Sequence, residues 1–418
     1  MGNLKIGIIG LGTVGQGVVK VLANYDDIEI KKAAVKNINK KRDVEVKYLT
    51  QDPMELARDP EIKVIVEVAG GLEIKDTLIE AIKNKKHIVT ANKELLAKFG
   101  AELFDCAREN NVAILYEAAV AGGIPIILPI KTSLKANEFQ NVAGILNGTT
   151  NYILTKMEEE KLSYEACLKK AQELGYAEFD PTSDVEGYDA MYKIAILANI
   201  VFNKRIDVEK IYHEGIVKIS PLDIQIADEL GYKIKLIAMA KRVENTDELD
   251  IRVHPMFVSK KNAISEIKNA TNAVLLNGFP VDRVMFVGPG AGEFPTTSSV
   301  VGDILSIKSE IGKYDTILPM TTCRHKEYAK QINIKETKNC YYLRIEAKNQ
   351  LGIIGKIGCA CEKFKVNLSS VVQKGINEDG SATILVVTEI SKEENILKMI
   401  EMLEKDGDIK VVNKIRVM

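Results

Sequence analysis

The chain has 418 residues, enough for two or three domains at roughly 150 residues each. Its 57 basic and 58 acidic side chains nearly cancel, and the net charge of -1 argues against a nucleic-acid-binding protein, which usually carries a basic excess. Apolar residues make up 46% of the chain, as in globular proteins, and its longest apolar stretches stay below the roughly 20 residues of a membrane span. Because Met1–Gly10 runs directly into a strand pattern without a cleavable signal, we expect a soluble, cytoplasmic protein with no membrane contact.

The first 135 residues alternate between strand and helix patterns. The predicted strands are Leu4–Ile9, Glu29–Val35, Val64–Val68, His87–Val89 and Val112–Tyr116, and the predicted helices are Thr13–Asn24, Pro53–Arg58, Ile74–Asn84 and Lys93–Asn110. Strands separated by helices favour right-handed crossovers and a parallel sheet. Residues 1–135 are therefore predicted to form a doubly wound α/β domain, which the helical segment Ser298–Ile311 is expected to rejoin over residues 296–318.

From Gly144 the pattern changes, and we predict an α+β domain over residues 136–295. Its predicted helices are Tyr152–Glu160, Ser163–Leu174 and Asp184–Val201, and its later strands lie near Leu249–Phe257 and Val284–Val287. The chain is polar and rich in lysine around Lys326–Lys338, so residues 319–338 are predicted to be a linker.

Residues 339–418 are predicted to form a separate module. In chain order the expected elements are strand Tyr341–Ala347, helix Ile353–Phe364, strands Leu368–Gln373 and Thr383–Thr388, helix Lys392–Glu404 and strand Lys410–Val417. The order βαββαβ is typical of a small ferredoxin-like unit.

The segment Gly10–Gly15 reads G-x-G-x-x-G where a strand ends and a helix begins. Glycines at these positions allow a tight turn and let the backbone approach a pyrophosphate at the helix N-terminus. Such a turn can also be purely structural, but the strand–turn–helix context favours dinucleotide binding and a Rossmann-type domain. The residues expected to contact the cofactor are Gly10, Leu11, Gly12, Thr13, Val14 and Gly15.

The end of the second strand bears on the choice between NAD and NADP. NAD-binding proteins usually place an acidic residue there, which accepts hydrogen bonds from the ribose hydroxyls. Here Lys36 stands near that place, and Lys40, Lys41 and Arg42 follow. This basic cluster suits the 2′-phosphate of NADP, although a solvated turn is the alternative and NAD stays possible.

Two further candidates follow strands of the first domain. Thr90 and Lys93 come after the fourth strand, and carboxyl ends of strands in such sheets line the cofactor crevice, so Lys93 is expected near the nicotinamide unless it is merely solvated. Glu117 follows the fifth strand, ahead of a run of small residues. One carboxylate with backbone carbonyls could hold a hard cation, and capping of the turn is the alternative.

The densest group of charged residues comprises Glu178, Asp184, Asp189 and Lys193. Asp189 and Lys193 are four residues apart and share one helix face, just before the nearly uncharged segment Ile194–Phe202. A surface ion pair would have the same spacing. Partial burial would instead let Lys193 act as a proton donor or acceptor.

Taken together, these segments resemble the homoserine dehydrogenase family. The matching segments, which span about Lys5–Ile311, are Gly10–Gly15, Val66–Gly71, Thr90–Lys93, Glu117–Val120, Gly144–Leu154, Asp184–Lys193, Gly288–Gly292, Pro295–Thr296 and Val301–Asp303. The resemblance implies reversible reduction of L-aspartate 4-semialdehyde to L-homoserine by a nicotinamide cofactor, in threonine and methionine biosynthesis. It also implies that residues 136–295 bind substrate and make a homodimer or homotetramer.

The resemblance further implies roles for single residues. Lys193 would donate the proton to the aldehyde oxygen, and Lys93 would assist beside the nicotinamide. Glu178, Asp184 and Asp189 would bind the substrate, chiefly through its ammonium group. A sodium ion would be held by Glu117 and the carbonyls of Val120, Gly122 and Ile124, and the cofactor would also meet Ala291 and Gly292.

The C-terminal module resembles an ACT domain, a small ligand-binding unit attached to many amino-acid enzymes. The usual D-x-P-G turn reads Asn349-Gln350-Leu351-Gly352 here, so the glycine is present while the acidic residue and the proline are not. The resemblance implies an amino-acid effector, with threonine expected. Two rivals stay open: another amino-acid dehydrogenase on the same scaffold, and a non-catalytic regulator that senses redox state by binding a dinucleotide.

Overall fold

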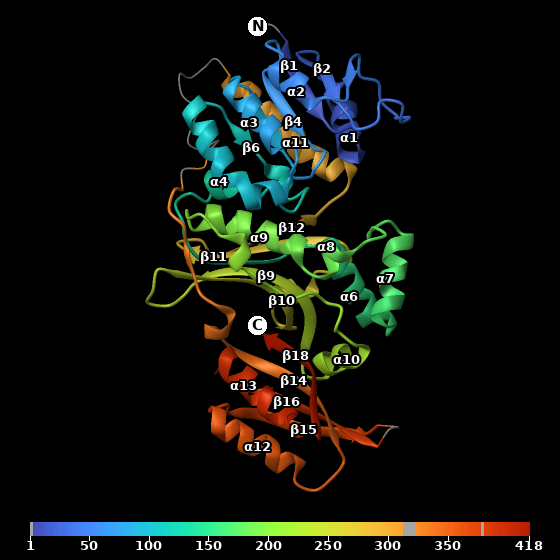
Figure 1. Cartoon of the computed structure of the whole chain (residues 1–418), viewed down its shortest axis with the longest axis vertical. Helices are drawn as coiled ribbons and strands as arrows, with labels where there is room; N and C mark the ends of the chain where they lie inside the picture. The colour runs from blue at the N-terminus through green and yellow to red at the C-terminus, as the bar shows by residue number, and fades with distance from the viewer. Residues whose placement is uncertain (1–2, 312–322, 324, 378–379) are drawn as a thin grey trace. The chain divides into compact units, whose positions relative to one another are not determined.

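The computed structural model of the chain describes residues 3–311, 323, 325–377 and 380–418 (Figure 1). The chain forms two compact units. The first comprises Met1–Gly148, Asp189–Ile211 and Ala270–Ala329, and the second comprises Thr149–Tyr188, Tyr212–Asn269 and Lys330–Met418. Within the described ranges, no helix has both the length and the apolar character needed to cross a membrane.

The first unit contains a six-stranded sheet in the order β3-β2-β1-β4-β5-β6. Its strands are β1 (Leu4–Ile9), β2 (Ile28–Ala34), β3 (Leu49–Thr50), β4 (Val64–Glu67), β5 (His87–Thr90) and β6 (Ile114–Leu115). Every neighbouring pair is parallel, which confirms the predicted doubly wound sheet; only the two-residue strand β3 was not predicted.

Two of the helices between these strands begin at a side-chain cap. The helices are α1 (Thr13–Leu22), α2 (Pro53–Arg58), α3 (Lys75–Lys83) and α4 (Lys93–Asn110), followed by the short helices η1 (Glu117–Ala119) and α5 (Ile127–Lys131). The predicted bounds of α2 and α4 are confirmed to the residue. The side chain of Asp52 accepts the backbone N–H of Met54, and that of Asn92 accepts the N–H of Leu95, so each helix has a defined start.

Helix α11 (Glu293–Glu310) also packs in this unit. Its buried residues Val300, Ile304 and Ile307 belong to the same apolar core as Ile6 and Ile8 of β1. The helix begins five residues before the predicted start at Ser298, and residues 312–318 of the predicted return lie outside the described residues. The predicted domain boundaries at residues 135 and 295 stay predictions.

The rest of the first unit contains the antiparallel strands β7 (Glu138–Ile145), β11 (Thr271–Phe279) and β12 (Asp282–Pro289), in the order β12-β11-β7, and helix α9 (Tyr188–Val201). Strand β11 was not predicted. The single helix predicted over Asp184–Val201 is wrong: α8 (Thr182–Val185) ends first, and Gly187 with φ +89° separates it from α9. A left-handed residue cannot continue a right-handed helix, so the chain changes direction there.

The second unit begins with α6 (Gly148–Glu160), α7 (Tyr164–Glu173), α8, β8 (Tyr212–His213) and α10 (Pro221–Glu229). Strands β9 (Tyr232–Arg242) and β10 (Glu248–Ser259) pair antiparallel, and β8, β13 (Lys330–Gln331) and β18 (Ile409–Val417) each pair parallel with part of β10. Neither α10 nor β9 was predicted.

The C-terminal elements follow the predicted βαββαβ order. They are β14 (Lys338–Lys348), α12 (Ile353–Phe364), β15 (Leu368–Ile376), β16 (Ser381–Thr388), the two-residue β17 (Ser391–Lys392), α13 (Glu393–Glu404) and β18. The four long strands form antiparallel pairs in the order β18-β14-β16-β15. Of the predicted linker 319–338, the described part includes β13 and a short helix at Ile334–Glu336, so this stretch carries local structure.

Candidate active site

The turn Gly10–Gly15 between β1 and α1 has the geometry of a pyrophosphate cradle. A Cβ atom on Gly15 would lie 2.0 Å from the carbonyl oxygen of Gly10, so only glycine fits where the helix meets the strand. A Cβ atom on Gly12 would meet nothing within 4 Å, and Gly12 precedes α1 without a side-chain cap. The turn is thus closed on the protein side and open at Gly12, where a phosphate could reach the helix N-terminus.

The stretch Gly288–Gly292 lies in the same unit. The N–H of Gly123 donates to the carbonyl of Pro289 at 3.0 Å, which joins this stretch to the small-residue run after η1. Gly292 directly precedes α11, and Glu293 of α11 pairs with Lys20 of α1 at 2.7 Å. Ala291 and Gly292 therefore lie at the end of α11 that contacts α1, the helix of the cradle.

The basic turn after β2 is organised by Arg42. The Arg42 guanidinium donates to the carbonyls of Asn37 (2.7 Å) and Lys40 (2.8 Å), so this cation is used within the turn. The side chain of Lys36 is 91% exposed, and its Nζ lies 3.3 Å from a carboxylate oxygen of Glu73. Lys36 is therefore the more accessible cation for a 2′-phosphate.

Asp189 is the centre of the charged cluster. Its side chain is buried, with Oδ1 3.0 Å from the Nζ of Lys93 and Oδ2 2.7 Å from the Nζ of Lys193. Oδ2 also accepts the side-chain amide of Asn147 at 2.9 Å, and Lys193 Nζ donates to the carbonyl of Leu146 at 2.8 Å. One buried carboxylate thus joins the two lysines that the sequence proposed separately for catalysis.

The electrostatics of this cluster follow from those contacts. Burial by itself would raise the pKa of the Asp189 carboxyl. The positive charges of Lys193 and Lys93 outweigh it, with hydrogen bonds from Lys193 and Asn147, and they hold that pKa below its ordinary value. Asp189 is therefore ionised near neutral pH, opposite the lysines that flank it.

Asn147 and the carbonyl of Leu146 were not among the site residues predicted from the sequence. Both lie just after β7, inside the segment Gly144–Leu154 that carried part of the family resemblance. The sequence does not reveal which backbone carbonyl will accept a side-chain hydrogen bond. Asn147 was predicted only to be a capping residue, because asparagine often precedes a helix. Their contact with α9 shows that they help to fix Lys193 and Asp189.

Glu178 and Asp184 belong to the second unit. Glu178 is exposed, and its backbone carbonyl accepts the side-chain amide of Gln172 at 3.1 Å. Asp184 lies half-buried on α8, a helix that is joined to the chain beyond α9 because the N–H of Ile216 donates to the carbonyl of Val185 at 2.9 Å. The role of both side chains in substrate binding stays a prediction.

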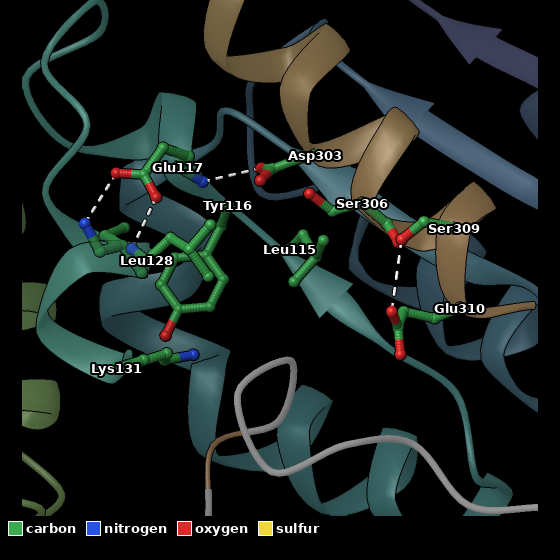
Figure 2. Close-up of a pocket in the computed structure, with 10 residues that line it drawn as sticks. Leu115, Tyr116, Glu117, Leu128, Lys131, Asp303, Ser306, Ser309 and Glu310 are labelled. Atoms are coloured by element: carbon green, nitrogen blue, oxygen red, sulfur yellow. Dashed lines mark hydrogen bonds between the residues drawn. The ribbon is translucent and has the colours of Figure 1, made fainter. Parts of the chain in front are cut away.

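Glu117 caps a turn of the backbone. Its Oε1 accepts the N–H groups of Ile126 (2.5 Å) and Ile127 (2.7 Å). Its Oε2 accepts the N–H of Leu128 at 2.7 Å (Figure 2). Burial raises the pKa of the Glu117 carboxyl, and these three N–H groups oppose that shift. Because a carboxylate offers about four lone pairs, one is left for a cation.

A cavity of roughly 170 Å³ lies beside this carboxylate. It is lined by residues from β6, α5 and α11, among them Lys131 and Asp303 (Figure 2). Asp303 accepts the backbone N–H of Glu117 at 2.9 Å, and burial raises the pKa of the Asp303 carboxyl to about 8. Asp303 is therefore mostly protonated at neutral pH, so this site adds less negative charge than its two carboxyl groups suggest.

Comparisons with known proteins give the chain its family. The family model described as homoserine dehydrogenase matches residues 125–305, and the model described as its NAD-binding domain matches residues 10–117. The homoserine dehydrogenase of Synechocystis is 40% identical over 98% of this chain and 98% of its own length. The chain belongs to the homoserine dehydrogenase family. The homoserine dehydrogenase of Bacillus subtilis is 38% identical over 100% of this chain and 98% of its own length.

Solved homoserine dehydrogenase structures match the whole chain. The crystal structure from Thiobacillus denitrificans has a TM-score of 0.93 and 35% identity, and it covers 100% of this chain and 98% of its own. The structure from S. aureus has a TM-score of 0.77 and 32% identity, covering 100% and 99%. As a homoserine dehydrogenase family member, the protein is an NAD(P)-dependent oxidoreductase that acts on a CH–OH group.

Proposed function

We propose that the chain interconverts L-aspartate 4-semialdehyde and L-homoserine, with Lys193 moving the proton. The observation that carries this proposal is the buried carboxylate of Asp189, which binds the ammonium groups of Lys193 and Lys93 at 2.7 and 3.0 Å. Two lysines held on one buried carboxylate are suited to a reaction in which negative charge develops on a substrate oxygen.

The proposed mechanism follows from that geometry. A bound nicotinamide would supply the hydride to the aldehyde carbon. The ammonium of Lys193 stabilises the charge that develops on the aldehyde oxygen and donates the proton to it; in the reverse direction the neutral amine accepts the proton of homoserine. Asp189 and the carbonyl of Leu146 fix the position of Nζ before substrate arrives.

The substrate contacts are proposed from the family motif. Glu178, Asp184 and Asp189 would bind the substrate, chiefly its ammonium group. Because the carboxylate of Asp189 already binds two lysines, we propose that it also acts through them by setting the positions of Lys193 and Lys93. Lys93 would then assist on the nicotinamide side.

The cofactor is proposed to be NADP, with NAD as a possible second cofactor. The residues proposed to hold it are Gly10, Leu11, Gly12, Thr13, Val14, Gly15, Lys36, Thr90, Lys93, Ala291 and Gly292. The open cradle at Gly12 and the exposed Lys36 support this proposal.

We also propose a sodium ion near Glu117. The described residues hold no group of three or more His, Cys, Asp or Glu side chains that could bind a metal, so a cation here depends on carbonyl oxygens. The carbonyls of Val120, Gly122 and Ile124 with the remaining lone pair of Glu117 are hard donors, which suit such an ion. At Gly122 the ion would compete with the hydroxyl of Ser299, which donates to that carbonyl at 2.7 Å.

The C-terminal module is proposed to be an ACT domain with threonine as its effector. A cavity of roughly 210 Å³ lies between the turn Lys348–Gly355 and three residues of β15 and β16, Gln373, Ala382 and Ile384, and an amino acid fits such a space. We further propose that the protein forms a homodimer or homotetramer, that it acts in threonine and methionine biosynthesis, and that it is cytoplasmic.

The test is an assay of the purified protein in both directions. We expect reduction of NADP that depends on L-homoserine, and oxidation of NADPH that depends on L-aspartate 4-semialdehyde. Turnover of 2-keto acids with ammonia instead would favour another amino-acid dehydrogenase on the same scaffold. Nucleotide binding without turnover of either substrate would favour a non-catalytic regulator.

A further inference from the structure

Glu67 is a completely buried carboxyl group, at the end of β4, that the proposed reaction does not use. Its Oε1 accepts the backbone N–H groups of Ala69 (3.0 Å) and Gly70 (2.9 Å) in the loop after β4. Its Oε2 accepts the hydroxyl of Thr90, at the end of β5, at 2.6 Å. One side chain therefore joins the carboxyl ends of two neighbouring strands.

The Thr90 hydroxyl extends this network to the start of α4. Thr90 Oγ1 accepts the backbone N–H of Asn92 at 3.0 Å. The amide of Asn92 donates to the carbonyl of Gly71 at 2.7 Å, and its Oδ1 accepts the N–H of Leu95 at 3.1 Å. The next residue after Asn92 is Lys93, whose ammonium contacts Asp189. The network therefore fixes the backbone position from which the Lys93 side chain extends.

The loop after β4 also contacts the dinucleotide turn. Ile9 of β1 lies opposite Glu67 in the parallel pairing of β1 and β4, so the two turns leave the same edge of the sheet. A Cβ atom on Gly10 would lie 2.7 Å from the Cα of Ala69, which shows how closely the backbones approach. In open α/β sheets this edge is where ligands bind.

Burying a carboxyl group between two loops costs free energy, because the group loses its hydration. Burial raises the pKa of Glu67, whereas the hydrogen bonds from Thr90, Gly70 and Ala69 act in the opposite direction. The side chain accepts hydrogen bonds at both oxygens, among them those from Ala69, Gly70 and Thr90, and this fixes its geometry more tightly than an apolar side chain of similar size would.

We propose that Glu67 is a positioning residue for hydride transfer: it holds the loop Val68–Gly71 against the dinucleotide turn and fixes the first residue of α4, so that the cofactor and Lys93 keep one relative geometry. This inference rests on the proposed function of Lys93. Glu67 acts through Thr90 and Asn92.

The experiment compares two variants of Glu67 at saturating homoserine and NADP. Glu67→Ala removes all three hydrogen bonds. Glu67→Gln can still link all three groups, because its Oε1 can accept both N–H groups and its Nε2 can donate to the Thr90 oxygen, which reverses the direction of that third hydrogen bond. Since displacing reacting groups by 1 Å can cost about 10²-fold, we expect E67A to lower kcat at least about tenfold. We expect E67Q to restore most of that loss.

The matched control is Lys86→Met, because Lys86 lies at the amino ends of the same two strands, away from Glu67. Lys86 directly precedes β5, it is buried, and its ammonium donates to the carbonyls of Asp59 and Ile62, which precede β4. This variant should lower stability without changing kcat. Amide hydrogen exchange gives the second measurement: E67A should exchange faster at Ala69, Gly70 and Leu95, and E67Q should not.

The proposal is overturned if E67A keeps wild-type kcat, or if K86M loses kcat to the same extent when the folded fractions are equal. It is also overturned if E67Q is as slow as E67A while exchange in the loop is normal. If the wild type does not oxidise homoserine, the proposed function fails instead. Titration of NADPH, followed by its own fluorescence, then tests Glu67 alone, because E67A should bind more weakly and E67Q should not.

Discussion

Replacing Lys193 by methionine tests the proposed proton donor with little change in volume. The lysine side chain is only 10% exposed, and its Nζ donates to Asp189 Oδ2 at 2.7 Å and to the carbonyl of Leu146 at 2.8 Å. Without Lys193, Asp189 still binds Lys93 at 3.0 Å and Asn147 at 2.9 Å, so its charge stays paired. The carbonyl of Leu146 loses a donor, which costs about 1–3 kcal/mol, and the lost hydrogen bond to a charged group costs about 1.5–3 kcal/mol.

Together these costs come to about 2.5–6 kcal/mol, below the middle of the roughly 5–15 kcal/mol that stabilises a typical folded protein, so we expect Lys193→Met to fold at 25 °C. The rate should fall much further. A positioned proton donor contributes about 10²–10⁴-fold, and the same ammonium also stabilises the developing oxyanion. We therefore expect kcat to fall by about 10³-fold or more, equivalent to about 4 kcal/mol at 1.36 kcal/mol per decade. The affinity for NADP should not change, because the cradle Gly10–Gly15 is untouched.

The assay is steady-state oxidation of homoserine, with NADPH affinity measured separately and the folded fraction followed by circular dichroism. Lys235→Met is the matched control, because Lys235 is also buried and its ammonium donates to Asn151 Oδ1 (3.1 Å) and to the carbonyl of Ile267 (2.6 Å). Lys235→Met should lose stability but keep kcat. A Lys193 variant with more than about a tenth of wild-type kcat would remove this residue from the role of proton donor.

The remaining predictions concern substrate, cofactor and pH. Glu178→Gln should raise KM for homoserine far more than KM for the nucleotide, and equal effects on both would indicate a structural role. NADP should bind more tightly than NAD, and Lys36→Ala should weaken NADP binding selectively by about tenfold or more, since a charge-assisted phosphate contact is lost; titration of both nucleotides checks this, and an unchanged ratio would contradict it. Burial raises the pKa of Asp303 to about 8, above roughly 3.9 in an unfolded chain, so between those values the folded state holds a proton that the unfolded state has lost. Stability should therefore decrease as the pH rises through that window, by up to about 1.4 kcal/mol per pH unit, and Asp303→Asn should remove this slope in urea unfolding at pH 5, 7 and 9; a slope that persists in the variant would assign it to other groups.

Features encoded by neighbouring residues could be predicted from the sequence. Helices Pro53–Arg58, Lys93–Asn110 and Ile353–Phe364 have the predicted bounds, because caps and the apolar period define them locally. The pair Asp189 and Lys193 was predicted for the same reason, since four residues of helix place both on one face. The dinucleotide turn Gly10–Gly15 was also predicted locally, from its glycine spacing between a strand and a helix.

Features decided by distant contacts could not be predicted. Strand β9 was not predicted. It buries the charged side chain of Lys235, and only the structure shows that its ammonium is bound by Asn151 and by the carbonyl of Ile267. The contact between Lys93 and Asp189 joins residues on α4 and α9, which no spacing in the sequence relates. The role of Glu67 likewise depends on its distance to Thr90 on the next strand.

The outer edge of β10 has a consequence for the order in which the second unit can assemble. The strands β8, β13 and β18 each pair with two residues of this edge, and the latest in the chain is β18, where Arg416 and Val417 pair with Met256 and Phe257. On the ribosome, β10 therefore emerges long before the strand that covers it. An uncovered strand edge readily pairs with other chains. Truncation before β18 would thus yield a protein whose sheet is open at Met256 and Phe257, and aggregation would follow from those unpaired backbone groups even where the catalytic lysines are intact.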